Sequence, residues 1–271
     1  MKALINAAAV MTLVAALAPS LSAQWPSHPT PGAPRLANGE PNPDAPVPRT
    51  ADGKPDLSGL WRGAGGGPGP NAPAGPPPSI PLATFRNVGA GFKEGLPLTP
   101  FGAEVLKKRM ADNSQDNPEA HCLPMGIMQF HIQGAPRKFF QTPGALVILY
   151  EASMGIRQIF SDGRPLPDND PQPWWYGYST GKWEGDTLVV QTTGFRDDGW
   201  LDINGSPLTG TGKVIERFRR TSYGKMEIDV TIEDPKIYSR PWTVRVNQQI
   251  MIDTDLLEFV CLENQRFGTT Q

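Results

Sequence analysis

The second half of the chain consists mainly of short β-rich runs separated by turn residues. From Lys138 onward the runs are KFFQT, ALVILYE, IRQIFS, YGYSTGKW, DTLVVQTTGF, KVIERFRR, KMEIDVTIE, WTVRVNQQI and LLEFVCLE. The segments between them, such as WEGD and SYGK, are typical of hairpin turns. Residues Met226 to Ile232 alternate apolar and polar side chains, which indicates a half-buried antiparallel strand. Because a long meander removes its edges by closing, the sequence predicts a mainly β fold, an antiparallel meander closing into a β-barrel.

One segment before these runs has the features of a helix. Thr99 is placed as the N-cap, Pro100 stands at the first helical position, and Lys107, Lys108 and Arg109 occupy the last turn. We therefore expect one short helix at residues 99–110, before the main strands.

The N-terminal region divides into two segments that precede the expected barrel. Residues 1–23 combine one lysine, an apolar run and small residues up to Ala23, which is the pattern of a cleaved secretory signal peptide. Residues 24–55 are rich in proline and have no apolar periodicity, so we expect a disordered tether. Residues 56–271 then form a single barrel domain with a Gly/Pro-rich loop at 63–81. The expected location is secreted or periplasmic, without a transmembrane segment after signal cleavage.

The chain has two cysteines, Cys122 and Cys261. In an oxidising compartment such a pair is usually bonded, so a structural disulfide is favoured over a free nucleophilic thiol at Cys122. The nearby His121 and His131 are too few for a zinc site once Cys122 is bonded, and we expect no metal. The histidines are then available as hydrogen-bonding or acid/base groups.

Charge and motifs exclude several function classes. The net charge of -2 argues against nucleic-acid binding, which needs a clustered excess of basic residues. The basic run ERFRR at Glu216 to Arg220 lies in a strand pattern. The sequence contains no Walker or dinucleotide glycine motif and no G-x-S-x-G, so we expect no cofactor and no serine-hydrolase triad.

Gly59, Leu60 and Trp61 form a G-x-W motif ahead of the β-rich runs. The motif resembles the start of the first strand in lipocalins, where the tryptophan closes the barrel floor and an arginine near the last strand packs on it. The resemblance implies that Arg266 covers Trp61. A helix between Trp61 and the next expected strand departs from the lipocalin pattern, so the resemblance implies a lipocalin-like barrel and not a strict lipocalin topology.

A closer resemblance spans nearly the whole chain after the signal peptide. The segments KPDLSGLW, PEAHCLP, RQIFSDGRPLP and GYSTGKWEGDTLVVQTTGF resemble a family of exported, uncharacterised bacterial proteins with a PDLSGLW motif. That resemblance implies export but no activity.

Two loops carry residues suited to binding a small molecule. The segment PWWYGY holds Trp174 and Tyr176, and the segment FRDDGWLDING holds Asp198, Trp200 and Asp202. Aromatic and carboxylate groups suit a sugar or a flat metabolite. The loops flank one predicted hairpin, so we expect them at the same end of the barrel, as a ligand mouth. The alternatives are that the aromatic residues belong to the core and that the acidic segment is a polar rim turn.

Arg157 and Glu216 form a third candidate group. Arg157 shares a strand face with Ile159, and Glu216 shares one with Val214. If these faces turn inward, the two charges lie in an apolar lumen and must be paired or used. The alternative is that they point to solvent.

The leading functional hypothesis is an exported binding protein for a small molecule, either a sugar or an aromatic or apolar metabolite. An alternative is a cofactor-free hydrolase, lyase or isomerase that uses Asp198 or Asp202 with His131 as acid/base groups. A further alternative is a structural or interaction module of the cell envelope that binds a macromolecule through the Pro-rich tether.

Overall fold

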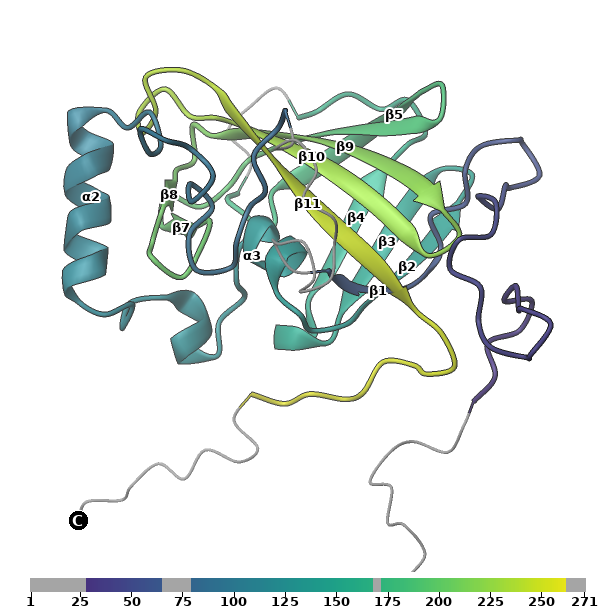
Figure 1. The fold of residues 1–271 in the computed structure, drawn as a ribbon. Coiled ribbons are helices and arrows are strands. Elements are labelled where there is room, and N and C mark those ends of the chain that lie inside the picture. Colours follow the sequence, from purple (N-terminus) through teal and green to yellow (C-terminus); the bar gives the residue numbers. More distant parts are fainter. Residues whose placement is uncertain (1–27, 65–78, 168–171, 262–271) are drawn as a thin grey trace, which may run out of the picture.

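The computed structural model describes residues 28–64, 79–167 and 172–261, and nine strands within them close into a barrel. The order around the barrel is β1-β11-β10-β9-β6-β5-β4-β3-β2 (Figure 1). The strands are β1 (Gly59–Gly63), β2 (Arg137–Thr142), β3 (Ala145–Tyr150), β4 (Ile156–Phe160), β5 (Tyr178–Glu184), β6 (Thr187–Thr193), β9 (Lys213–Ser222), β10 (Lys225–Glu233) and β11 (Trp242–Met251). This architecture confirms the predicted fold class, a mainly β chain closed into a barrel of lipocalin-like type.

The barrel departs from a pure meander at two places. Strands β4 and β5 are parallel, because the connection after β4 carries the chain back along the barrel before β5 begins. All other neighbours in the barrel are antiparallel. Between β6 and β9 the chain leaves the barrel and forms a separate sheet of β7 (Gly199–Trp200) and β8 (Pro207–Leu208).

Alternation along the strands fills the barrel with side chains. In β10, Met226, Ile228, Val230 and Ile232 are all buried, as the sequence pattern predicts. The end of the barrel at Trp61, which we call the floor, is closed by the buried indole ring of that residue. The indole N–H donates to the Leu57 carbonyl at 3.0 Å, and the Arg220 guanidinium lies 4.9 Å from the ring centroid. Arg220 of β9 thus takes the position expected for Arg266, which lies outside the described residues.

Helix α2 (Pro100–Ala111) matches the predicted helix. Thr99 caps it by accepting a hydrogen bond from the Gly102 amide at 3.1 Å. Gly102 packs on the backbone after β10, where an added Cβ would lie 2.4 Å from the Ile237 carbonyl oxygen. At the other end, the Arg109 guanidinium lies 4.6 Å from the Trp200 ring centroid. The helix therefore packs outside the barrel, against the β7–β8 sheet (Figure 1).

A second helix, α3 (Ile127–Ile132), was not predicted. All of its residues are buried, and it contacts β1 and β11 on one side while Gly126 packs against the Trp200 carbonyl on the other. Helix α3 therefore lies between the barrel and the β7–β8 sheet, at the end opposite the floor (Figure 1). Two short 3₁₀ turns, η1 (Pro118–His121) and η2 (Ala152–Met154), complete the helical elements of the described chain.

The described part of the Pro-rich N-terminal segment packs against the barrel, contrary to the expected disorder. Arg35 forms an ion pair with Asp253 at 2.6 Å, and Arg49 forms one with Asp186 at 2.6 Å. The Tyr223 amide donates to the Ala45 carbonyl at 2.8 Å. Ion pairs and backbone hydrogen bonds of this kind leave no apolar periodicity in the sequence. Residues 28–55 are therefore ordered although their sequence pattern does not show it. The predicted signal peptide lies outside the described residues.

Cys122 and Cys261 are disulfide-bonded, as predicted. The run LLEFVCLE was expected to be a strand, but β11 ends at Met251 and residues 252–261 have no strand pairing. Leu257 and Phe259 are exposed, so this run has no apolar face buried against a sheet. The bridge therefore ties η1 to the segment after the last strand. In the described part of the chain, no helix has both the length and the apolar character needed to cross a membrane.

Candidate functional site

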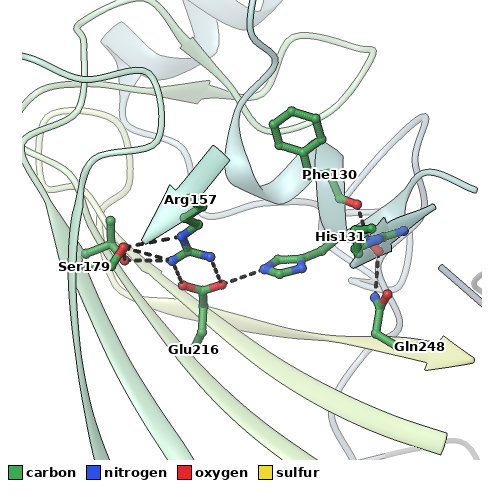
Figure 2. Close-up of polar contacts among 8 residues, drawn as sticks. Phe130, His131, Arg157, Ser179, Glu216 and Gln248 are labelled. Atoms are coloured by element: carbon green, nitrogen blue, oxygen red, sulfur yellow. Dashed lines mark hydrogen bonds and ion pairs between the residues drawn. The ribbon is translucent and has the colours of Figure 1, made fainter. Parts of the chain in front are cut away.

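A polar cluster lies inside the barrel near α3 and is centred on Glu216 of β9 (Figure 2). Arg157 of β4 donates from Nη1 to Glu216 Oε1 at 2.9 Å and from Nη2 to Oε2. His131 of α3 lies with Nε2 at 2.6 Å from Glu216 Oε1. Arg157 Nη2 also donates to Thr192 Oγ1 at 3.0 Å and to Ser179 Oγ at 3.2 Å. Each of these side chains is buried.

The inward direction of the two charges follows from strand alternation. Glu216 lies between Val214 and Phe218 on the inner face of β9, and Arg157 shares the inner face of β4 with Ile159. Of the two orientations left open by the sequence, the structure has the inward one. A charged pair in an apolar lumen must be neutralised internally, and Arg157 and Glu216 neutralise each other.

The pKa values show which protonation states the cluster holds. Burial raises the pKa of Glu216, but the Arg157 guanidinium beside it outweighs burial and lowers that pKa to about 2, so Glu216 is ionised. Burial lowers the pKa of His131 below its usual value, and the imidazole is neutral at pH 7. Because a carboxylate only accepts hydrogen bonds, Nε2 of His131 carries the proton that faces Glu216. Nδ1 of the neutral ring is then an acceptor.

Several buried polar atoms around α3 have no hydrogen-bond partner among the described residues. They are His131 Nδ1, Tyr150 Oη, Arg137 Nε and Gln248 Oε1. Gln248 Nε2 donates to the His131 carbonyl at 2.8 Å (Figure 2). Arg137 donates to the carbonyls of Phe130 and Gln133. The Tyr150 hydroxyl faces the Arg157 guanidinium without meeting hydrogen-bond geometry. These buried atoms can each still form a hydrogen bond.

Aromatic rings connect this cluster to the rim of the barrel. Phe130 stacks on Tyr150 with ring centroids 3.9 Å apart, and Tyr176 lies 5.4 Å from Phe130. Tyr176 is half-buried, whereas Trp174, two residues before it, is exposed. Of the predicted aromatic pair, Tyr176 therefore reaches toward the interior and Trp174 stays on the rim.

The aromatic and acidic loops lie at the same end of the barrel, as expected from the hairpin. Trp174 pairs with Phe195, and the Arg196 guanidinium lies 4.4 Å from the Trp175 ring centroid. The expected open mouth is nevertheless absent at Trp200, whose side chain is buried under Arg109. The cavity beside Trp200 has a volume of about 20 Å³, which is room for about one water molecule.

The carboxylates predicted as acid/base groups have other partners. Asp202 is buried, and it accepts hydrogen bonds from the amides of Val88 at 2.8 Å, Gly205 at 2.9 Å and Ser206 at 2.9 Å. Asp198 is exposed and pairs with Arg196 at 3.1 Å. Neither contacts His131, so their predicted acid/base role with that histidine lacks the required geometry.

His121 also stays apart from the cluster, because its Nε2 lies 2.7 Å from the Gln115 carbonyl oxygen on the surface. Among the described residues, no group of three or more His, Cys, Asp or Glu side chains is arranged to hold a metal ion.

Sequence analysis did not single out several members of the cluster. They are Tyr150, Ser179, Thr192, Arg137 and Gln248. A usable signal was present in β11, where Trp242, Val244 and Val246 set the inward phase and Gln248 continues it with a polar side chain. A polar residue at an inward position of an alternating strand indicates a lumen group.

Neither a protein-family model nor a curated protein sequence matches this chain. The candidate site therefore rests on its geometry.

Proposed function

We propose that the protein is an exported small-molecule-binding protein of lipocalin-like type that holds a polar ligand beside His131. The observation that carries the proposal is the set of buried polar atoms around α3 that have no partner among the described residues. Buried polar groups are normally hydrogen-bonded, and unpaired ones are costly unless a function requires them. A bound molecule that pairs with these atoms supplies that function.

The charges of the cluster determine the ligand class. Arg157 is neutralised by Glu216, and His131 is neutral. Buried Arg137 donates only to backbone carbonyls and has no acidic partner among the described residues, so a cationic ligand would enter the lumen without a counter-ion. The groups that remain are both donors and acceptors, since Tyr150 donates while His131 Nδ1 and Gln248 Oε1 accept. A sugar or a hydroxylated aromatic metabolite matches this pattern.

The rim and the interior suggest the route by which a ligand enters. Tyr176, Phe130 and Tyr150 form a continuous aromatic contact from the half-buried rim to the polar cluster. An aromatic or sugar ring can stack along such a path. Entry then requires Tyr176 or α3 to move, because the groups around the cluster are buried.

A matched pair of tyrosine variants tests this assignment. A panel of sugars and phenolic metabolites is screened for thermal stabilisation of the wild type, and a ligand at a hundredfold excess over its Kd adds about 2.7 kcal/mol. Tyr150→Phe removes a hydroxyl without a partner, so the variant folds and loses the response to the ligand. Tyr178→Phe, at a rim tyrosine outside the cluster, keeps the response. Equal stabilisation of wild type and Tyr150→Phe contradicts the site, and a panel without any stabilising member contradicts the function.

The His131–Glu216 contact favours an enzyme as the second candidate. A carboxylate that holds Nε2–H of a neutral histidine leaves Nδ1 positioned as a general base. This arrangement suits a cofactor-free lyase, isomerase or hydrolase that removes a proton from a substrate in the lumen. Turnover of a panel member that is lost in His131→Gln, while binding of that compound persists, selects the enzyme over the binding protein.

A further inference from the structure

Strand β4 covers only part of the neighbouring edge of β5, so the rest of that edge is open. The parallel pairing of β4 and β5 covers two residue pairs, Ile159 with Ser179 and Phe160 with Thr180. The pairing of β5 with β6 on the other side covers β5 from Tyr178 to Glu184. Residues 181–184 therefore have a strand partner on the β6 side and no strand partner on the β4 side within the described chain. Because alternate residues of a strand direct their backbone groups to opposite sides, part of this segment presents N–H and C=O groups that have no backbone partner among the described residues.

A groove of about 550 Å³ follows this open edge. Its lining includes Gly181 and Trp183 from the inner face of β5, and Lys182 from the outer face of the same strand. The groove also extends over the outer face of the hairpin, where Val189 and Gln191 of β6 line it, so it covers both the edge and the outer face of β5. The opposite wall is the loop after β4, with Ser161 and Arg164. The β5–β6 hairpin that carries this edge is drawn at the upper right of Figure 1.

We propose that this groove binds an extended segment of another polypeptide, which adds to β5 as a strand. A peptide backbone offers donors and acceptors at the spacing of a strand, so main-chain hydrogen bonds supply the affinity and side-chain pockets supply the specificity. This interaction is separate from the ligand site at α3, because no residue that lines the groove belongs to the buried cluster around Glu216.

The side chains along the edge set the sequence of the preferred peptide. Arg164 is paired with Asp162, and Glu184 is paired with Arg217, whereas exposed Lys182 forms no ion pair within the described residues. An acidic residue opposite Lys182 complements it, since opposite charges across strands are stabilising. Half-buried Trp183 points to the other face and favours an apolar residue there. The expected peptide therefore carries an acidic residue next to an apolar one.

Defined peptides test the proposal on the full-length protein with its disulfide intact. The probe is an N-acetylated peptide of alternating threonine and valine with a central glutamate, and its partner peptide has lysine in place of glutamate. We expect the acidic peptide to shift the amide signals of residues 181–184 in NMR spectra and to bind more tightly than the basic one. Lys182→Glu should weaken binding of the acidic peptide about tenfold and reverse the preference, because like charges then face each other. The matched control Lys107→Glu, on the exposed surface of α2, should change neither affinity.

Backbone methylation separates strand addition from simple charge attraction. N-methylation of every second residue blocks the hydrogen bonds of one peptide edge, so one methylation register should abolish binding and the other should retain it. Equal binding of both methylated peptides overturns the proposal, as does the absence of binding by the unmethylated acidic peptide. A concentration-dependent dimer in ultracentrifugation that shifts the same amide signals without peptide also overturns it, because a second copy then occupies the edge.

Discussion

Replacing Glu216 with glutamine tests whether the ion pair in the barrel is as fully desolvated as its geometry indicates. The change Glu216→Gln keeps the shape of the side chain and an oxygen that can accept the hydrogen bond from His131 Nε2. It removes the charge that neutralises Arg157, whose side chain is 1% exposed. An arginine left charged in an apolar interior is strongly unfavourable, so we expect the variant to fold with a much lower free energy of unfolding.

The structure sets the size of the effect. Glu216 makes two hydrogen bonds to Arg157 and one to His131. In the two bonds to Arg157 both the donor and the acceptor are ionised, which makes these bonds strong. Removing one partner of a buried pair of this kind costs about 3–5 kcal/mol. That loss is a large part of a typical total of about 5–15 kcal/mol, so the variant should remain folded in buffer and unfold early in urea.

A double-mutant cycle provides the control. Arg157→Met alone leaves Glu216 without its counter-ion and should cost about as much, whereas Arg157→Met with Glu216→Gln removes both charges and should cost less than the sum of the single changes. Ser179 and Thr192 then retain their mutual hydrogen bond of 3.0 Å. Urea unfolding at pH 7 with the disulfide oxidised measures all four proteins. Single-variant losses below about 1 kcal/mol with negligible coupling would refute the desolvated pair.

Other perturbations give separate checks. Because burial lowers the pKa of His131, the unfolded chain takes up a proton below about pH 6.5 that the folded chain does not, so stability should fall between pH 7 and pH 5. His131→Gln should flatten that part of the profile in urea titrations at each pH, and an unchanged profile counts against a neutral buried imidazole. Trp200→Ala should lower the free energy of unfolding by about 3–5 kcal/mol because the ring is buried, whereas Asp198→Ala, at an exposed pair, should change it by less than about 0.5 kcal/mol. Equal effects in thermal unfolding would place both residues on the rim. Replacing the disulfide, which spans 139 residues, with a pair of serines should cost less than about 5 kcal/mol, because the exposed segment after Met251 gains freedom in the folded variant. A larger loss in urea unfolding would mean that the bridge also holds native packing.

Most strands of the barrel were predictable because they carry a local signal. Alternation in β10 and the turn residues between runs specify antiparallel strands without reference to the rest of the chain. Helix α3 carries no such signal, since IMQFHI is buried on all sides and has no polar face to set a helical period. The parallel pairing of β4 with β5 also escapes prediction, because it depends on the path of the connection after Phe160 and not on either strand.

The candidate site was predictable only in part, for a similar reason. Glu216 lies between Val214 and Phe218 in an alternating strand, so its phase relative to the core can be read from its neighbours. Its contact with His131 joins residues 85 positions apart, and no local pattern encodes that distance. Trp200 was misplaced on the rim because its own segment is polar, while Arg109, which covers its ring, comes from a helix far away in the sequence.

The two ends of the barrel differ in how their buried polar groups are paired. At the floor, Arg220 is also buried without an acidic partner, and burial lowers its pKa to about 10. Its guanidinium nevertheless donates to the carbonyls of Asp56, Ser58, Ser222 and Tyr223, so its hydrogen bonds are made within the chain. At the α3 end, polar atoms of equal burial lack partners in the described chain and surround a neutral histidine. A barrel that needed only stability would satisfy both ends alike. The unpaired polar atoms around α3 therefore distinguish this end from the floor, and they are the groups that the proposed ligand site would use.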